Sequence, residues 1–216
     1  AIEESGLSQS EFGGPLFLAA PPVELEWWQR IALDADGAKA GGEPGYQRLL
    51  HAARTGSHPA FFQSAQFGTI ASQLQQRIGT RGLPITLSTA CASGATAIQL
   101  GVEAIRRGEA ERVVSVGTDG SVTAEALVRF SLLSALSTQN DVPEKASKPF
   151  SKDRDGFVMG EGAGALVMES LESATARGAT VTETQKRAYE AVDAIDWPGG
   201  FCRRDIGWRA IAREQK

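Results

Sequence analysis

The stretch that most constrains the fold runs from residue 83 to residue 105, where a short apolar segment leads through a cysteine into a helical pattern. Residues 83–87 have the length and apolar character of a strand. From Ala95 to Ile105, apolar side chains recur every three or four positions, which is the spacing of one helix face. The sequence therefore predicts a strand that passes into a helix at Cys91.

A second strand follows this helix. Residues 112–117, RVVSVG, combine valines with a closing glycine and indicate a buried strand. The order strand, helix, strand is that of a βαβ unit, which implies parallel pairing and a right-handed crossover. Two further apolar strands are predicted at residues 15–20 and 163–168. The chain is therefore predicted to have an α/β fold.

Cys91 lies at the junction of strand and helix, so its chemistry depends on its surroundings. Ser88 and Thr89 precede it and are residue types that cap helix starts. Three small residues would let backbone amides approach a ligand: Ala90, Ala92 and Gly94. A thiol there experiences the positive end of the helix dipole and unpaired N–H donors, which favour the thiolate and supply an oxyanion hole. A cysteine on an apolar stripe is more often a small packed residue, so the surrounding motif must decide.

Three motifs occur in one order along the chain: TACASG at residues 89–94, ALSTQN at residues 135–140 and KPFSKDRDGFVMGEGAG at residues 148–164. They resemble the nucleophile motif and the segments that follow it in the elongating β-ketoacyl-acyl-carrier-protein synthases, the condensing enzymes of fatty acid synthesis. The resemblance covers residues 1–179. It implies the thiolase-like fold, layered helix, sheet, helix, sheet, helix, of which this chain supplies mostly the N-terminal half without its first strand.

The resemblance also implies a reaction, the decarboxylative Claisen condensation. An acyl group moves from carrier-protein phosphopantetheine to Cys91, and malonyl carrier protein then supplies the carbanion. Cys91 is the implied nucleophile, and its backbone N–H is one implied oxyanion donor. Phe130 matches the position where the family has a phenylalanine that gates the acyl pocket, with an ordinary core aromatic as the equal alternative.

Two partners are implied by the resemblance: acyl carrier protein with its phosphopantetheine-linked acyl and malonyl groups, and a second copy of the chain. The family dimerises near the nucleophile strand and the strand at residues 112–117. A polyketide-type ketosynthase is an alternative, because the substrate walls that differ lie largely elsewhere. A non-catalytic thiolase-fold partner subunit is another; Cys91 argues against it, since such subunits lack the cysteine.

The resemblance ends near residue 179. Residues 180–216 show neither the strand nor the motifs expected next in a condensing enzyme, so we divide the chain into a synthase N-terminal domain, 1–179, and a divergent tail, 180–216. One hypothesis for the tail is a shifted reading frame on a truncated gene product. The family's two histidines, lysine and glycine-rich oxyanion loop have no match here, so the residues of the second half-reaction are expected to be lacking. His51 and His58 are expected to be solvated or packed.

Composition excludes several classes of function. Lys plus Arg number 22 and Asp plus Glu 26 among 216 residues, so the net charge is −4, and no basic run suits nucleic acid or an anionic membrane. No signal peptide and no apolar run of about 18 residues is found. Cys91 and Cys202 are too few for a disulfide framework and fit a reducing, cytoplasmic setting.

Neither a metal nor a cofactor is expected. Residues 153–156, DRDG, are similar to part of a calcium loop, but that loop would need an acid at Ser151 and a glutamate at Gly162. The glycines of residues 160–164 resemble a dinucleotide-binding loop, yet they precede an apolar strand instead of following one. A turn with close backbone packing explains them better.

Apolar spacing and turn residues predict the remaining elements. Helices are expected over residues 1–7, 23–32, 46–54, 61–78 and 123–136. Residues 34–45 hold four glycines and a proline and are predicted to form a flexible surface loop.

Overall fold

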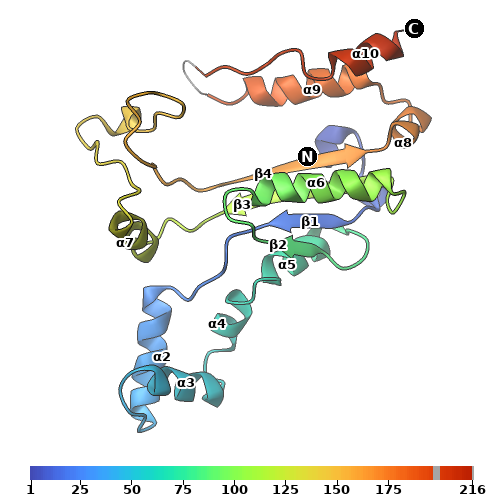
Figure 1. The fold of residues 1–216 in the computed structure, drawn as a ribbon. Coiled ribbons are helices and arrows are strands. Elements are labelled where there is room, and N and C mark those ends of the chain that lie inside the picture. The colour runs from blue at the N-terminus through green and yellow to red at the C-terminus, as the bar shows by residue number, and fades with distance from the viewer. Residues whose placement is uncertain (197–199, 216) are drawn as a thin grey trace.

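The computed structural model describes residues 1–196 and 200–215, and this part of the chain is built around one four-stranded sheet (Figure 1). The strands are β1 Leu16–Ala19, β2 Ile85–Leu87, β3 Arg112–Asp119 and β4 Gly162–Glu169. They lie in the order β2–β1–β3–β4. β1 pairs in parallel with β2 and β3, and β4 pairs antiparallel with β3. The four predicted strands are therefore confirmed.

β1 occupies the centre of the parallel part because it is apolar on both faces. Its residues, Leu16, Phe17, Leu18 and Ala19, are each at most 5% exposed. A strand covered on both sides takes such a continuous apolar sequence. The predicted strand–helix–strand unit consequently has β1 inserted into it: β2 and β3 are parallel, but each pairs with β1 and not with the other.

Helices cover the two faces of the sheet. α6 (Ser93–Arg106) packs on one face through Ala97 and Ala104, and α5 (Thr69–Ile78) packs on the other through Ala71. Successive β1 residues alternate between these two apolar clusters, as side chains of a pleated strand must. This arrangement of helix, sheet and helix agrees with the layered α/β fold that the sequence predicts.

The position of α6 on the sheet is fixed where the backbone of the helix comes close to side chains of β3 and β4. A Cβ atom added at Gly101 would lie 2.5 Å from Met168 Cε and 2.9 Å from Ser115 Oγ, so a larger residue there would force these side chains to shift. Ser115, which is 3% exposed, donates a hydrogen bond of 2.9 Å to the carbonyl oxygen of Ala97. Because both contacts hold α6 against β3, they also fix where the helix begins beside Cys91.

The remaining helices surround this centre. They are η1 Glu3–Ser5, α1 Gln9–Phe12, α2 Trp27–Lys39, α3 Tyr46–Thr55, α4 Pro59–Ser64, α7 Ala124–Leu132, η2 Pro143–Lys145, α8 Leu171–Ala176, α9 Val181–Asp193 and α10 Trp208–Glu214. The helix predicted over residues 1–7 is only the short turn η1, closed by Gly6 with φ of 79°. Within the described residues, no helix is both long and apolar enough to cross a membrane.

The predicted loop over residues 34–45 is wrong in its first half, because α2 continues to Lys39. Gly37 is not there for flexibility. An added Cβ at this position would lie 2.3 Å from the carbonyl oxygen of Arg48, so the glycine lets α2 approach α3 closely. The beginning of the predicted helix over 23–32 is also wrong, since α2 starts only at Trp27, after an extended segment that follows two prolines.

The single helix predicted over residues 61–78 is two helices, α4 and α5, separated by a break at residues 65–68. Pro59 occupies the first turn of α4, where its missing N–H costs nothing. At the break, Thr69 donates a hydrogen bond of 2.6 Å from Oγ1 to the carbonyl oxygen of Gln63. This bond satisfies the last turn of α4 and turns the chain into α5, which apolar spacing alone does not reveal.

The tail contains the helices α9 and α10, which the sequence did not lead us to predict. Glu214 of α10 accepts hydrogen bonds from the N–H groups of Val181 (2.6 Å) and Thr182 (3.1 Å), so one helix caps the start of the other. Arg187 donates from Nη1 to the carbonyl oxygen of Glu4 at 3.1 Å. Residues 197–199 and 216 of the predicted tail lie outside the described residues.

The start of β3 and the end of β4 are joined by a cluster of charged side chains around Glu169. Its carboxylate, 9% exposed, accepts hydrogen bonds from Arg112 Nε (2.7 Å), Arg177 Nη2 (2.7 Å) and Ser173 Oγ (2.8 Å). Burial acts to raise the pKa of Glu169, but these hydrogen bonds outweigh it and lower the pKa from 4.5 to about 2. We call Glu169, Arg112, Arg177 and Ser173 the Glu169 cluster.

Candidate active site

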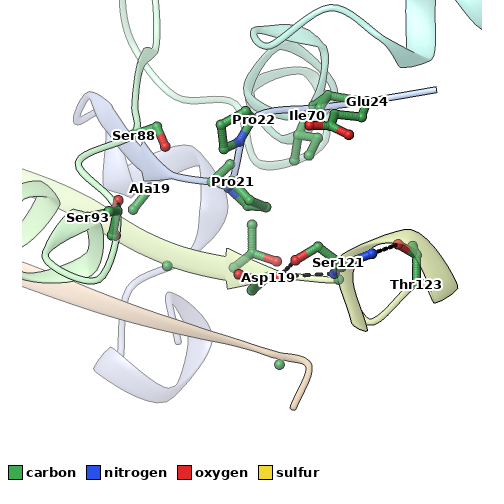
Figure 2. A pocket seen from close by; sticks show the side chains of 18 of the residues that line it. Ala19, Pro21, Pro22, Glu24, Ile70, Ser88, Ser93, Asp119, Ser121 and Thr123 are labelled. Atoms are coloured by element: carbon green, nitrogen blue, oxygen red, sulfur yellow. Dashed lines mark hydrogen bonds between the residues drawn. The ribbon is translucent and has the colours of Figure 1, made fainter. Parts of the chain in front are cut away.

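A cavity of about 1,040 Å³ opens at the carboxyl ends of β1, β2 and β3. In parallel α/β sheets this end is where ligands bind, because strand ends and helix N-termini meet there. Figure 2 shows the labelled side chains facing this space from several elements, among them Ser88 and Ser93 beside the start of α6 and Asp119 at the end of β3.

Cys91 lines this cavity and its side chain is exposed. It lies two residues before the first residue of α6, so the predicted passage from strand to helix is confirmed at this position. Ala90, immediately before it, has φ of 52°, a left-handed conformation that non-glycine residues seldom adopt. The sharp turn lifts the thiol out of the packed core, so the interpretation of Cys91 as a small packed residue is wrong.

Ser88 and Thr89 do not cap α6 as predicted. The N-cap residue is Ala92, and no side chain accepts a capping hydrogen bond there. Ser93, the first helical residue, bonds backward instead: its Oγ accepts from the N–H of Thr89 at 2.7 Å and donates to the carbonyl oxygen of Ala90 at 2.6 Å. The hydroxyl groups near Cys91 therefore bind the turn and leave the helix start open toward the cavity.

Phe130, on α7, lines the same cavity as Cys91. Its side chain is 39% exposed and meets Phe157 edge-on, with ring centroids 6.5 Å apart. The structure therefore places the two site residues that the sequence predicts, Cys91 and Phe130, on one cavity, and the Phe130 ring is only partly covered.

An ion pair joins two walls of the cavity. The sequence does not predict it. Arg129 of α7 donates from both terminal nitrogens to Glu24, one of them at 2.8 Å, and Arg30 lies 3.6 Å from the same carboxylate. The hydrogen bond from Arg129 lowers the pKa of Glu24, and the same bond raises the pKa of Arg129. Since Glu24 follows β1 and Arg129 lies 105 positions later, the pair ties two walls of the cavity together.

The end of β3 shapes another part of the cavity through a tight turn. Asp119 accepts a hydrogen bond from the N–H of Ser121 at 3.0 Å and also bonds its hydroxyl (Figure 2). Thr123 then caps α7 by accepting from the N–H of Ala126 at 3.2 Å. This short connection places α7, and with it Phe130, over the carboxyl ends of the strands.

The two histidines lie away from this site, and neither lines the cavity. His58 Nε2 is 2.6 Å from Asp36 Oδ2, and its ring stacks on Phe61 with centroids 4.6 Å apart. The hydrogen bond from His58 is the main reason that the pKa of Asp36 is lowered. His58 is therefore packed, as the sequence predicts, and joins α2 to the start of α4.

Residues 35–174 match the family described as "Beta-ketoacyl synthase, N-terminal domain". The chain belongs to this family. The match includes the cysteine motif, α7 and β4, so the resemblance carried by the three sequence motifs is confirmed.

Curated relatives and solved structures agree with this assignment. The 3-oxoacyl-[acyl-carrier-protein] synthase 2 of Vibrio cholerae serotype O1 is 38% identical over 185 residues, which cover 84% of this chain and 41% of the relative. The chain thus spans about two fifths of that β-ketoacyl synthase. A β-ketoacyl synthase from Burkholderia phymatum is similar over 83% of this chain and 43% of its own, with a TM-score of 0.59 and 27% identity.

A second solved structure includes a partner. It is a type II polyketide ketosynthase, AntDE, in complex with its acyl-carrier protein AntF and bound to the hexaketide. This structure matches 83% of the present chain and 43% of its own with a TM-score of 0.62 and 28% identity. The thiolase-like fold predicted from the sequence is therefore confirmed for this domain.

Proposed function

We propose that this β-ketoacyl synthase domain carries the acyl-accepting nucleophile of a 3-oxoacyl-acyl-carrier-protein synthase of fatty acid biosynthesis. The observation that carries the proposal is the position of Cys91. Its side chain is exposed just before the N-terminus of α6 and lines the same cavity as Phe130. A nucleophilic thiol must be accessible to its substrate. Cys91, which is exposed and lines the cavity, meets this requirement.

In the proposed step, the Cys91 thiolate attacks the carbonyl carbon of an acyl thioester held on phosphopantetheine. A new carbon–sulfur bond forms, the tetrahedral oxyanion collapses, and the pantetheine thiolate leaves with its electron pair and is then protonated. The product on Cys91 is again a thioester, so its carbonyl stays reactive toward carbon nucleophiles. A serine ester would be more stabilised by resonance and less suited to the next step.

The backbone N–H of Cys91 is the proposed first donor to the oxyanion. Among the described residues, no carbonyl or side chain accepts a hydrogen bond from this N–H, so it is available to a ligand. A donor of this kind contributes about 10² to 10³ in rate. Phe130 is the proposed gate of the acyl pocket, since it lines the cavity from the opposite element, α7.

The second half-reaction needs groups that stabilise the enolate formed by decarboxylation of the malonyl group. Neither of the two histidines lines the cavity. His58 is hydrogen-bonded to Asp36, and His51 lies on α3. We therefore propose that the 216-residue chain accepts an acyl group and condenses it weakly or not at all. Rapid turnover of malonyl carrier protein by the purified chain would contradict this.

Relatives favour fatty acid synthesis over the alternatives. The relatives with the higher identity, 38% for Vibrio cholerae, are named 3-oxoacyl-acyl-carrier-protein synthases, while the polyketide enzyme AntDE is 28% identical. Because Cys91 is present, a non-catalytic subunit is not favoured. The complex of AntDE with its acyl-carrier protein supports an acyl carrier protein as the partner of this chain.

A homodimer through the edge of β2 is part of the proposal. β3 is paired on both sides, by β1 and β4, so the strand at 112–117 has no free edge for pairing with a strand of another chain. β2 is the last strand of the sheet, and nearby Leu83 and Ile85 are 89% and 49% exposed. An uncovered edge with exposed apolar side chains suits pairing with a second copy.

Domain limits and location complete the proposal. We propose that residues 1–179 form the synthase domain and residues 180–216 a separate tail, because α9 forms hydrogen bonds with α10 and with Ile206 just before it. A cytoplasmic setting is proposed because Cys91 must remain a thiol to react.

Acylation followed by intact-mass measurement tests the proposal. The chain is incubated with an acyl thioester, and three variants are compared: Cys91→Ala, Cys202→Ser and the double variant. The proposal predicts one added acyl mass in the unaltered chain and in Cys202→Ser, and none in either chain that lacks Cys91. A cerulenin-type epoxide should label the same two chains. Equal acylation of Cys91→Ala would overturn the proposal.

A further inference from the structure

The turn that presents Cys91 is held in a conformation that its own residue disfavours. Ala90 has φ of 52°, where an L side chain crowds the following carbonyl group. Glycine would adopt this conformation freely, but the chain has alanine. Such a residue keeps its conformation only when neighbouring groups hold it there.

One hydroxyl group binds the backbone on both sides of Ala90. Ser93 Oγ accepts a hydrogen bond from the N–H of Thr89 at 2.7 Å and donates its proton to the carbonyl oxygen of Ala90 at 2.6 Å. The N–H of Ser93 also donates to the Ala90 carbonyl, at 3.1 Å. A hydroxyl has one proton and two lone pairs, so Ser93 can make both side-chain bonds at once.

A second hydroxyl supports the first from one helical turn further along. Thr96 Oγ1 donates to the carbonyl oxygen of Ala92 at 3.0 Å and lies 3.1 Å from Thr89 Oγ1. Because the Thr96 proton is already engaged, Thr89 is the donor in the bond between the two threonines. Thr89, which begins the turn, is therefore fixed to α6 through its backbone and its side chain.

We propose that Ser93 is a positioning residue, which holds the Ala90 turn closed and thereby keeps the Cys91 thiol at the start of α6, facing the cavity. The inference rests on the proposed function for what the thiol does there, but the positioning itself does not. Without the hydroxyl, the turn can relax toward ordinary φ values, and the sulfur then moves away from the helix N-terminus. The thiol loses both its orientation and its favourable electrostatic surroundings.

Alkylation by iodoacetamide tests the position of the thiol without any need for enzymatic activity. All chains carry Cys202→Ser, so that Cys91 is the one thiol measured. We expect Ser93→Ala to react about three- to tenfold more slowly at pH 7, because the relaxed turn no longer holds the thiol exposed at the start of α6. Ser93→Thr retains the hydroxyl and should stay within about twofold of the unaltered rate.

Gln99→Ala is the matched control, since Gln99 is an exposed residue of α6 that does not line the cavity. It should leave the alkylation rate unchanged. Equal rates for Ser93→Ala and the unaltered chain would overturn the proposal. So would a Ser93→Thr variant that is as slow as Ser93→Ala, because the hydroxyl would then not be the acting group.

Acylation by a thioester separates positioning from substrate binding. Ser93→Ala should lower the maximal rate of Cys91 acylation about tenfold, with little change in the thioester concentration that gives half this rate. If the unaltered chain accepts no acyl group, the proposed function fails, while the alkylation result still decides the role of Ser93.

The double variant Ala90→Gly/Ser93→Ala tests whether Ser93 acts through the turn, and it also applies if Ser93→Ala fails to fold. Glycine adopts the left-handed conformation without steric strain. Ser93→Ala should therefore lower the alkylation rate several-fold less when residue 90 is Gly than when it is Ala. Partial recovery of the melting temperature and of the alkylation rate would support the proposal. A Ser93→Ala loss of the same size in both backgrounds would overturn it.

Discussion

The two ends of the sheet are built in opposite ways. At the start of β3 and the end of β4, the Glu169 cluster satisfies a shielded carboxylate with two guanidinium groups and a hydroxyl. At the carboxyl ends of the parallel strands, Cys91 is exposed, its N–H has no backbone acceptor among the described residues, and Ala90 is strained. The contrast indicates that satisfied polar groups stabilise this fold, while the exposed thiol is the group to which we assign the proposed chemistry.

The largest expected effect is at the open end of the sheet. Cys91→Ser should lower the rate of acyl transfer from a thioester roughly a thousandfold or more, because a serine hydroxyl is hardly ionised near neutral pH. Thiol release from the thioester measures the rate. The melting temperature should change by less than about 2 °C, since the side chain is exposed. A large loss of stability would show that Cys91 belongs to the packed framework.

At the closed end, Glu169→Ala should lower the free energy of unfolding by about 2–4 kcal/mol, because two arginines and a serine lose a shielded partner. Denaturant unfolding measures this change. Glu183→Ala is the matched control: its ion pair with Arg187 is about half exposed, so about 0.5 kcal/mol or less should be lost. Equal losses for the two variants would remove the distinction between the two ends.

Acid should weaken the closed end in a defined range of pH. The pKa of Glu169 is lowered in the folded chain to about 2 from 4.5, so its stabilisation is complete above pH 4.5 and is lost as the pH falls through about 2. A shift of this size corresponds to about 3 kcal/mol. Unfolding of the unaltered chain and of Glu169→Gln, measured from pH 6 to pH 2, should therefore converge at low pH. Parallel curves would contradict the role of the ionised carboxylate.

The smallest expected effect concerns Phe130, at the same end of the sheet as Cys91. Phe130→Ala should change the relative acylation rates of short and long acyl thioesters by a few fold, because the ring occupies part of the cavity wall. Competition between thioesters of two chain lengths, read by intact mass, measures the preference. Phe157→Ala is the control, since Phe157 contacts Phe130 but does not line the cavity. An equal change in chain-length preference in both variants would contradict the role of Phe130 as the gate of the acyl pocket.

Periodicity was sufficient to predict the framework. The strands at residues 16–19 and 112–119 are apolar and bounded by prolines, glycines or charges, so their positions follow from local sequence. The place of Cys91 at the start of α6 follows from the same pattern. Nothing local, however, shows that β1 lies between β2 and β3, because the order of strands depends on contacts between distant segments.

The predictions from sequence that are wrong involve a glycine within a helix and contacts between residues distant in the sequence. Gly37 was assigned to a loop, whereas it sits within α2 because the backbone of α3 passes too close for a side chain. The bond from Thr69 that breaks the predicted helix over 61–78 joins residues six positions apart. The pair of Glu24 with Arg129 joins residues far more distant, so no pattern in one stretch could reveal that these side chains face each other across the site.

The central claim is that one thiol, at the open end of the sheet, accepts the acyl group. The chain contains its own internal comparison, because Cys202 is also exposed but lies in the tail, away from the cavity. Peptide mapping of the unaltered chain after brief incubation with an acyl thioester measures the acyl group on each cysteine. The account predicts acylation of Cys91 with little or none on Cys202. Equal acylation of both cysteines, or acylation of Cys202 alone, would contradict it.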